Sequence, residues 1–356
     1  DGFNSIIQME NNDYFYALSS NKNIKIIIYN QVNILIPWNG LGRMHDKYVI
    51  ADDSLYILGG RNTFGYFLGD YAGHKNYDRD VLVYNTGSKD SSIYQIKDYY
   101  KKITSQKCCS VFHYNESLGE KNSVKKAEQE LKNRYESLEN KYDKFLAENY
   151  DYKANTYETN KINLLSNPTS LYAKQPTVYY GLMYLAKNAR KEVKIHTPYI
   201  ICNDYMYNEL KNIKVPTTIM TNSAENNGNI FGAVDYLNHK KDIINTGVTI
   251  KEYEGGISYH GKSMTIDDDI AIVGSFNMDM RSAYIDTELM LVINSKDINK
   301  QLKASMEEYE KKAATVKNET EYSHIPEGMK MKELSDKKKN IKAWFGWAMN
   351  GLRFLF

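Results

Sequence analysis

The second half of the chain alternates between short apolar segments and amphipathic segments. The apolar segments at 194–200, 217–221 and 248–253 predict buried strands, and the segments at about 203–213 and 230–245 predict helices. Strands that alternate with helices are typical of a layered α/β domain with a largely parallel central sheet.

The first half shows the same kind of pattern with fewer elements. Residues 4–19 predict a helix and residues 24–29 a strand. Nothing before them supplies the earlier strand, helix and strand of the second half. We therefore expect that Asp1 lies just after a strand, and that an N-terminal portion, with any signal peptide or membrane anchor, is absent from this sequence.

A charged segment separates the halves. Residues 120–150 carry apolar side chains at a three-four spacing, which favours an insertion helix packed on the body over a coiled-coil partner site. The apolar positions are Val124, Ala127, Leu131, Tyr135, Leu138, Tyr142 and Phe145. Residues 151–170 are rich in Asn, Tyr, Thr and Ser and are expected to form a loop that joins the halves.

The two halves contain an internal repeat, in which every member of a residue set is displaced by 215 positions (260 − 45). The set is His45, Lys47, Asp52, Gly59 and Asn62, and it recurs as His260, Lys262, Asp267, Gly274 and Asn277. In both copies the motif continues as a predicted strand, an acidic turn and a second strand. These strands are 48–51 and 55–58 in the first copy, and 264–266 and 270–273 in the second. Two copies in one register are not accidental.

The repeat predicts two pseudo-symmetric α/β/α sandwich domains with mostly parallel or mixed central sheets, the first of them N-terminally incomplete. We expect four parts: a first half at 1–110, a helical insertion and linker at 111–170, a second half at 171–315, and an amphipathic tail at 316–356.

Composition narrows the classes of protein that fit. The 356 residues are 42% hydrophobic, enough for a large core and two to three domain-sized units. The formal net charge of +2 gives no strong field that would attract nucleic acid. Cys108, Cys109 and Cys202 lack the spacing of a zinc site and predict a fold that does not depend on disulfides. No apolar run of about 18 residues is present, so we expect no transmembrane helix within this sequence.

The repeated motif carries groups suited to phosphoryl transfer. Side chains two apart in a strand share a face, so His45 and Lys47 project together, as do His260 and Lys262. One neutral imidazole can attack phosphorus, while the other, protonated, donates to the leaving oxygen and then activates water or an alcohol. The lysines stabilise the charge on the phosphate oxygens. Further neutral donors are Asn62, Ser275 and Asn277. This chemistry requires no metal ion and no cofactor.

The sequence strings around the two His-x-Lys motifs resemble the paired HKD motifs of the phospholipase D superfamily. The first copy is His-Asp-Lys-Tyr-Val-Ile-Ala-Asp followed by Gly-Gly-Arg-Asn. The second is His-Gly-Lys-Ser-Met-Thr-Ile-Asp followed by Gly-Ser-Phe-Asn-Met-Asp-Met-Arg-Ser. The strings at 43–45, 59–62, 78–83 and 274–288 resemble the bacterial cardiolipin synthase branch in particular. The resemblance covers nearly the whole chain outside residues 98–170.

The resemblance implies a role for each motif residue. His45 would be the nucleophile and His260 the general acid and base, with the reverse assignment still open. Four side chains would hold the phosphate: Lys47, Lys262, Asn62 and Asn277. Asp52 and Asp267 would belong to the catalytic motifs as supporting carboxylates. Glu288 and Asp80 would each orient an imidazole by accepting a hydrogen bond from its other ring nitrogen.

The other histidines are expected to be structural: His74, His113, His196, His239 and His324. Of these, His196 fits either a pocket wall or the core. The acidic run 267–269 fits a solvated turn better than a Mg²⁺ or Ca²⁺ site. Residues 341–356 combine Trp and Phe with basic residues, which favours a helix in the interface of an anionic membrane. The alternative is a helix that docks on the protein's own core.

These patterns predict a cardiolipin synthase-like phosphatidyltransferase that acts on phospholipid at a bacterial cell membrane, either peripherally or through an anchor in the missing N-terminal part. The acceptor would be phosphatidylglycerol or another alcohol. A phospholipase D or a nuclease-type phosphodiesterase would use the same residues with water, but the near-neutral charge and the tail disfavour nucleic acid. Two complete motifs disfavour an inactive membrane-binding scaffold. No obligate protein partner is expected.

Overall fold

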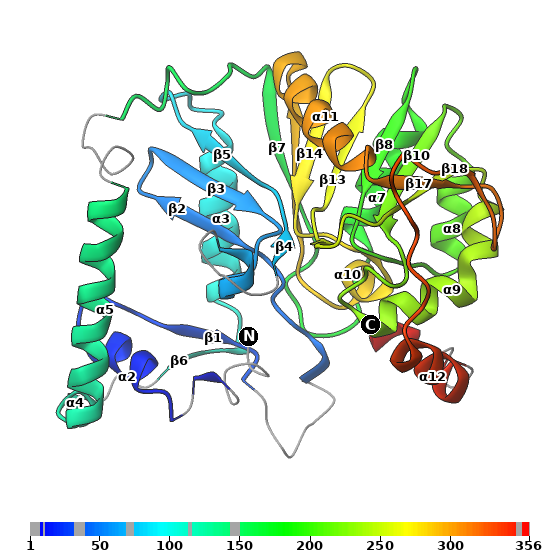
Figure 1. The fold of residues 1–356 in the computed structure, drawn as a ribbon. Coiled ribbons are helices and arrows are strands. Elements are labelled where there is room, and N and C mark those ends of the chain that lie inside the picture. The colour runs from blue at the N-terminus through cyan, green and yellow to red at the C-terminus, as the bar shows by residue number, and fades with distance from the viewer. Residues whose placement is uncertain are drawn as a thin grey trace. The chain divides into compact units, whose positions relative to one another are not determined.

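The computed structural model describes residues 8–9, 11–31, 40–68, 75–112, 116–142, 150–346 and 351–355 (Figure 1). The chain forms two packing units. The first contains residues 1–44, 98–156 and 169–172, and the second contains residues 45–97, 157–168 and 173–356. The expected boundaries at 110, 170 and 315 follow the repeat rather than the packing, and they stay predictions.

The first unit is built around two helices that share a small apolar contact. Its elements are α2 (Asp13–Ser20), β1 (Ile27–Tyr29), β6 (Cys109–Val111), α4 (Glu116–Gly119) and α5 (Asn122–Lys141). Ala17 of α2 packs against Val124 and Ala127 of α5. Tyr135, farther along α5, is 61% exposed. The prediction of a packed insertion helix is therefore confirmed only for its first turns, and Phe145 lies outside the described residues.

A mixed sheet forms the centre of the second unit. In the described residues it has nine strands, in the order β18 (Tyr322–His324), β17 (Ala313–Val316), β11 (Thr249–Tyr253), β10 (Thr217–Asn222), β8 (Val193–His196), β13 (Ser263–Ile266), β14 (Ile270–Gly274), β16 (Leu289–Asn294) and β7 (Lys161–Ser166). Strands β8, β10 and β11 are parallel, and the other pairs are antiparallel. This confirms the predicted α/β class and its mixed central sheet.

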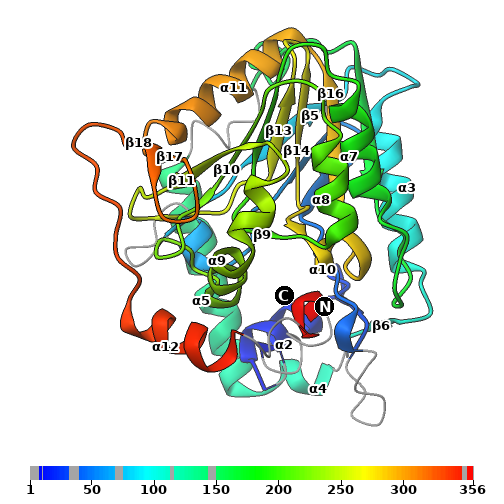
Figure 2. The ribbon, with the colours of Figure 1, turned by 90° about the vertical axis from the view of Figure 1, so that its right-hand side faces the viewer.

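Helices cover both faces of this sheet. Figure 2 shows the strands between α11 (Lys296–Glu310) on one side and α7 (Thr177–Lys187) with α8 (Asp204–Lys211) on the other. Helix α9 (Ile230–Ile244) follows β10, as the sequence predicts. The side chains of Asn203 and Asn229 cap the first turns of α8 and α9 by accepting backbone N–H groups.

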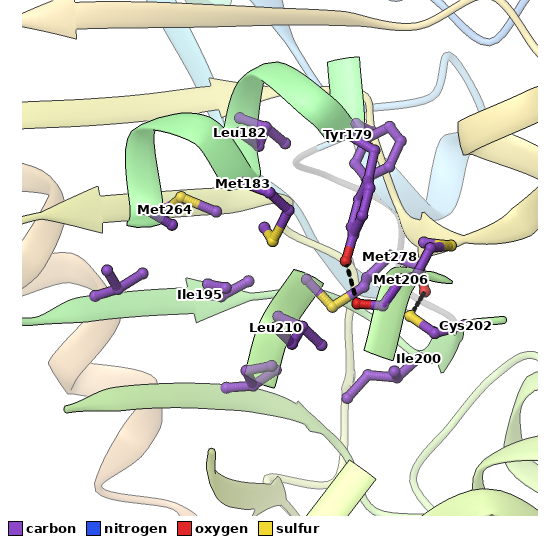
Figure 3. Close-up of a cluster of buried hydrophobic side chains, with 14 of the residues drawn as sticks. Tyr179, Leu182, Met183, Ile195, Ile200, Cys202, Met206, Leu210, Met264 and Met278 are labelled. Carbon is purple, nitrogen blue, oxygen red and sulfur yellow. Dashed lines mark hydrogen bonds between the residues drawn. The ribbon is translucent and has the colours of Figure 1, made fainter. Parts of the chain in front are cut away.

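The core of the second unit lies between the sheet and α7 and α8. Figure 3 shows Leu182 and Met183 of α7 facing Ile195 and Met264 of the sheet. Tyr179 is also fully buried, and its hydroxyl donates to the carbonyl of Met206 at 2.6 Å, so no polar group of the ring is left without a partner.

The loop expected at 151–170 contains a strand. Strand β7 pairs with β16 along six residues and closes one edge of the large sheet. The Asn- and Thr-rich composition on both sides concealed the alternation of Ile162 and Leu164. A partner strand, rather than local preference, defines this element.

Each His-x-Lys motif precedes an antiparallel three-strand unit. In the first copy this is β2 (Tyr48–Ala51), β3 (Leu55–Gly59) and β5 (Asp80–Tyr84), which form a separate small sheet. In the second copy it is β13, β14 and β16 within the large sheet. Gly59 pairs with Asp80 and Gly274 pairs with Met290, so the two units correspond strand for strand.

Short elements complete the second unit: η2 (Gly65–Phe67), β4 (Asn76–Tyr77), β9 (Ile200–Ile201), β12 (Ser258–Tyr259), β15 (Met278–Asp279), α10 (Met280–Tyr284), α12 (Asp336–Phe345) and η4 (Arg353–Leu355). Helix α3 (Ser92–Thr104) crosses the boundary between the units at residue 97. Among the described residues, no helix is long and apolar enough to cross a membrane.

Candidate active site

Both His-x-Lys motifs lie in the second packing unit, at the carboxyl ends of its parallel strands. Strand β13 is antiparallel to β8, and Ser263 pairs with His196 at the end of β8. The preceding residues, His260 to Lys262, therefore lie beyond that end, which is where open α/β sheets bind their ligands.

Two matched backbone contacts hold His45 and His260. The N–H of His260 donates to the carbonyl of Tyr77 at 2.6 Å, next to the parallel pair formed by β12 and β4. The N–H of His45 donates to the carbonyl of Thr287 at 3.3 Å. Each histidine is thus fixed beside the strand that belongs to the other copy of the motif.

A buried carboxylate accepts from the Nδ1 side of each ring. His45 Nδ1 lies 2.9 Å from Glu288 Oε1, and His260 Nδ1 lies 2.6 Å from Asp78 Oδ2. The imidazoles are 25% and 18% exposed, whereas both carboxylates are fully buried. The carboxylates favour the Nδ1–H tautomer, which leaves Nε2 of each ring for a substrate.

The expected position of Asp80 beside an imidazole is wrong. Its carboxylate pairs with Arg61 at 2.6 Å, and Asp78 takes the place beside His260. Asp80 pairs with Gly59 just as Met290 pairs with Gly274, so Asp78 corresponds to Glu288, each two residues before the paired position. The sequence contained this signal, but 21 residues (80 − 59) separate the paired positions in the first copy and 16 (290 − 274) in the second. That difference shifts the register of the repeat.

The two lysines bring the motif copies together. Lys262 is buried, lies 3.3 Å from Asp78 Oδ2 and donates to the carbonyl of His260 at 2.5 Å. Lys47 donates to the carbonyl of His45. A Cβ atom on Gly60 would lie only 2.8 Å from Lys262 Cδ, so glycine there permits the lysine of one copy to pass the turn of the other.

Both imidazoles are neutral at neutral pH in this arrangement. Removal from water, and then repulsion by Lys47, lowers the pKa of His45 well below its usual 6.5. Removal from water, and then Lys262, lowers the pKa of His260 to about 4, although Asp78 opposes the shift. Lys47 and Lys262 thus each lower the pKa of both imidazoles.

The two carboxylates differ in charge state. Burial raises the pKa of Glu288 to about 7, although Lys47 opposes this. Burial would also raise the pKa of Asp78, but Lys262 and His260 outweigh it and bring the value to about 2. Removal from water lowers the pKa of Lys47 to about 7. The His260 side therefore holds a fixed negative charge at neutral pH, and the His45 side holds a group that titrates there.

The predicted phosphate-binding side chains have different surroundings. Asn277 is buried, and its Nδ2 lies 3.1 Å from the hydroxyl of Tyr199. Asn62, at the equivalent position after β3, is half-buried. The Ser275 hydroxyl instead donates to Glu288, so in this structure it stabilises the carboxylate. Its role as a phosphate ligand stays a prediction.

Asp52 and Asp267 do not lie with the histidines. Both occupy the turn at the far end of the strand that follows the lysine, and both have positive φ angles, 51° and 52°. A four-residue strand is about 13 Å long. Asp267 also accepts the backbone N–H groups of Arg190 and Lys191 at 3.0 and 2.7 Å. Aspartate tolerates this left-handed conformation, so the motif carboxylates are turn residues and their expected catalytic role is corrected.

His196 belongs to the core rather than to a pocket wall facing solvent. It is buried, with Nδ1 3.0 Å from the Tyr259 hydroxyl and Nε2 3.3 Å from Glu310 Oε1. His239 is half-buried and pairs with Asp242 at 2.8 Å, and His324 is exposed. His74 and His113 lie outside the described residues.

Within the described ranges, no group of three or more His, Cys, Asp or Glu side chains is arranged to hold a metal ion. In the acidic turn, Asp268 pairs with Lys191 and Asp267 binds backbone N–H groups. These contacts are those of a surface turn, as the sequence predicts.

Comparison with known proteins identifies similar sequences and a similar structure. Residues 182–309 match the family described as "Cardiolipin synthase, PLD-like domain". The similarity to this family thus lies in the second half of the chain, around the second copy of the motif. Cardiolipin synthase 1 of Staphylococcus epidermidis is 30% identical over 159 residues, which are 44% of this chain and 32% of that protein. An uncharacterized protein of Helicobacter pylori is 25% identical over 296 residues, 75% of this chain and 57% of the relative.

The phospholipase D-like chain therefore spans about half or less of the length of these relatives. A crystal structure of phosphatidylserine synthase from Haemophilus influenzae superposes with a TM-score of 0.56 at 17% identity, covering 88% of this chain and 71% of that one. At this identity the similarity shows the fold alone.

Proposed function

We propose that this protein is a phosphatidyltransferase that cleaves a phospholipid phosphodiester through a covalent phosphohistidine and passes the phosphatidyl group to an alcohol. The observation that carries the proposal is the pair of accessible imidazoles, each bound at Nδ1 by a buried carboxylate and accompanied by a lysine, half-buried Lys47 in one copy and buried Lys262 in the other. Two such pairs supply a nucleophile, an acid and the cations that a phosphodiester needs.

In the first step, His45 Nε2 forms a bond to phosphorus while the bond from phosphorus to the leaving oxygen breaks. A protonated His260 gives its Nε2 proton to that oxygen. The bound phosphodiester anion favours this protonation, because its charge offsets the nearby lysines that lower the pKa of His260. Lys47 and Lys262, with Asn277 and Asn62, stabilise the charge on the phosphate oxygens.

In the second step, the acceptor hydroxyl gives its proton to His260 Nε2 and its oxygen attacks phosphorus. The bond between phosphorus and His45 breaks, so both imidazoles return to their starting state. An alcohol acceptor gives transfer, and water gives hydrolysis.

The assignment of His45 as nucleophile rests on the unlike carboxylates. Asp78 stays ionised beside His260 and stabilises the imidazolium that an acid requires. His45 has the strongly lowered pKa of a neutral nucleophile. In the reverse assignment the acid would be paired with Glu288, which holds a full negative charge only above about pH 7.

The choice of phospholipid rests on the relatives. The Staphylococcus epidermidis relative is named a cardiolipin synthase, which favours phosphatidylglycerol as both donor and acceptor. The near-zero net charge disfavours a nucleic acid. We place the protein at a bacterial cell membrane, as its substrate requires. A hydrolase that uses water is the alternative.

Labelled phosphatidylglycerol vesicles distinguish these outcomes. Cardiolipin plus glycerol supports transfer, and phosphatidic acid supports hydrolysis. Equal rates with and without EDTA are expected, and loss of activity with EDTA contradicts a metal-free mechanism. Acid-labile, base-stable label trapped on the protein should disappear in His45→Ala. Vesicle binding without any turnover would instead indicate an inactive scaffold.

A further inference from the structure

The C-terminal segment from α12 to η4 is anchored on the second packing unit by two cations. Lys338 is buried, and its ammonium group donates to three backbone carbonyls, those of Ala224 at 2.8 Å, Glu225 at 2.6 Å and Asn227 at 3.0 Å. Three carbonyls satisfy all three of its donors, so this lysine serves as a fixed attachment point.

Arg353 forms the second anchor. Its guanidinium makes two contacts with the Asp235 carboxylate, at 2.7 and 3.1 Å, and a third with the carbonyl of Cys202 at 2.8 Å. Asp235 is buried in α9, so this is a two-point ion pair away from bulk water. Figure 2 shows α12 beside α9, and Asn238 of α9 donates to the carbonyl of Gly346 at 3.2 Å.

The Lys338 anchor and the C-terminal end of the segment contact the loops that hold the two motif histidines. The loop that receives Lys338 begins at Asn222, whose side chain binds both the N–H and the carbonyl of Tyr259, the residue before His260. At the C-terminal end of the segment, Arg281 donates to the carbonyl of Leu355 at 3.2 Å and pairs with Asp286 at 3.0 Å. The charge of Asp286 in turn acts on His45.

The outward side of the segment is apolar and basic. Trp344 is 76% exposed, Leu352 45% and Phe354 44%. Lys337, Lys339 and Lys342 are also exposed. Between residues 336 and 346 the sequence has four lysines and one acidic residue, Asp336.

A helix that only covers the core would bury its aromatic side chains. Here the polar anchors point inward and Trp344 points outward. An exposed indole beside lysines has the chemistry of an interfacial helix on an anionic bilayer, where the ring enters the headgroup region and the lysines meet lipid phosphates.

We propose that residues 336–346 and 351–355 form the surface by which this protein rests on an anionic phospholipid bilayer, and that Lys338 and Arg353 hold this surface in a fixed position against the catalytic loops. Docking would then bring the bilayer to the carboxyl ends of the parallel strands, where the two His-x-Lys motifs lie. The inference deepens the proposed function and rests on it for its substrate.

Vesicle co-sedimentation tests the surface without any need for turnover. The change Trp344→Ser with Leu352→Ser and Phe354→Ser should abolish binding to vesicles of phosphatidylglycerol and phosphatidylcholine. Each basic residue near such a surface contributes about fivefold to binding, so Lys337→Gln with Lys339→Gln and Lys342→Gln should weaken it about 100-fold. Binding of the unchanged protein should fall with salt and be weak to pure phosphatidylcholine.

Matched controls use exposed side chains elsewhere in the same unit. Tyr180→Ser with Tyr184→Ser removes two exposed aromatic rings from α7, and should leave vesicle binding unchanged. If the Trp344 variant binds as well as this control, the segment is not the membrane surface.

The anchors are tested by comparing substrates. In the variant Lys338→Gln with Arg353→Gln, vesicle binding should stay within threefold, and turnover of monomeric short-chain phosphatidylglycerol should also stay within threefold. Turnover of vesicles should fall at least tenfold. Unchanged vesicle turnover, with the melting temperature also unchanged, would overturn the anchoring role.

These outcomes separate the surface from the chemistry. If neither short-chain lipid nor a soluble p-nitrophenyl phosphodiester is cleaved by the unchanged protein, the proposed function fails, while vesicle binding still decides the surface. If both are cleaved but vesicles neither bind nor speed turnover, the surface fails and the proposed function stands.

Discussion

The carboxylates of Asp78 and Glu288 occupy equivalent positions in the repeat, yet we expect them to have different roles. Asp78 would act on the general acid and base, His260, and Glu288 on the nucleophile, His45. Asp78→Asn removes the charge that stabilises a protonated His260, so turnover of phospholipid should fall roughly 100-fold or more. A p-nitrophenyl leaving group needs no proton, so the first-turnover release of p-nitrophenol from such an ester should fall less than tenfold. Single-turnover rates of leaving-group release with the two substrates check this prediction, because the second step uses His260 whatever has left.

Glu288→Gln should slow both substrates to the same degree, because the carboxylate acts on the attacking imidazole whatever leaves. Asp52→Asn is the control, since Asn also tolerates the left-handed turn, and its rates should stay within threefold of the unchanged protein. If Asp78→Asn and Glu288→Gln respond identically to the leaving group, the assignment of His45 and His260 is contradicted.

Tyr199 is a positioning residue that the sequence did not reveal. Asn277 Oδ1 is buried without a hydrogen-bond partner in the structure, and its Nδ2 lies next to the Tyr199 hydroxyl. Turning the amide lets Tyr199 donate to Oδ1 and directs the NH₂ group, a phosphate donor, to the vacated side. Burial raises the pKa of Tyr199 well above 10, which keeps this donor protonated.

Tyr199→Phe should therefore lower kcat/KM about 10-fold or more with little change in the melting temperature. Combined with Asn277→Ala, the loss should be no greater than for Asn277→Ala alone, because both changes remove one interaction. Purely additive losses in this double-mutant cycle would mean that Tyr199 acts elsewhere.

At the scale of elements, sequence periodicity predicted the second half well. The predicted strand at 248–253 and helix at 230–245 match β11 and α9 within two residues. The local sequence is enough to predict such elements, because their apolar positions are strongly periodic and Asn residues cap the helices. Strand β7 was missed because its partner, β16, lies more than 100 residues away and no local signal specifies the pairing.

Part of the site was predictable for the same reason. His45, Lys47, His260 and Lys262 were found because the repeat marks them twice. Asp78 was not, since its correspondence to Glu288 depends on strand register, which becomes visible only once β3 pairs with β5. The catalytic role given to Asp52 failed because a repeated residue can be repeated for its backbone conformation.

Gly274 illustrates how strand pairing constrains the motif. A Cβ atom there would lie 2.8 Å from Met290 Cα and closer still to the Leu289 carbonyl oxygen. Gly274→Ala should force β14 and β16 apart and destabilise the protein by about 1–3 kcal/mol, measured as the free energy of unfolding in urea. A Cβ atom at Gly351 would meet nothing within 4 Å, so Gly351→Ala should be neutral. Equal stability of the two variants would show that the strands yield at no cost.

At the scale of the whole molecule, the sequence predicted the fold class better than it predicted the packing of the chain into units. The first motif's strands β2, β3 and β5 belong to the packing unit of the second half, and β3 and β5 contact β14. A repeat identifies homologous segments, but it does not say which of them share a core. Both histidines in one unit place the complete site there.

The free energy of unfolding should decrease at low pH because buried histidines become protonated more readily in the unfolded chain. We use His196 to test this, because it is buried in the core and belongs to neither motif. Removal from water lowers its pKa to about 4, although Glu310 opposes the shift, and Arg79 and Lys194 add to it. Because the folded state disfavours the charged ring, the unfolded chain binds the extra proton. Stability is therefore full above pH 6.5 and is lost as pH falls from 6.5 towards 4.

His196→Gln removes this titration. Its unfolding free energy, from urea curves between pH 4 and 7, should fall less steeply with acid than that of the unchanged protein, with a difference of up to about 3 kcal/mol. His324→Gln is the control, since the side chain of that histidine is exposed. Parallel pH dependence for His196→Gln and the unchanged protein would mean that the pKa of His196 does not change on folding, which contradicts this prediction. A difference of the opposite sign would mean that His196 and Glu310 form a buried ion pair, whose contribution is lost when the pH rises through the pKa of the imidazole.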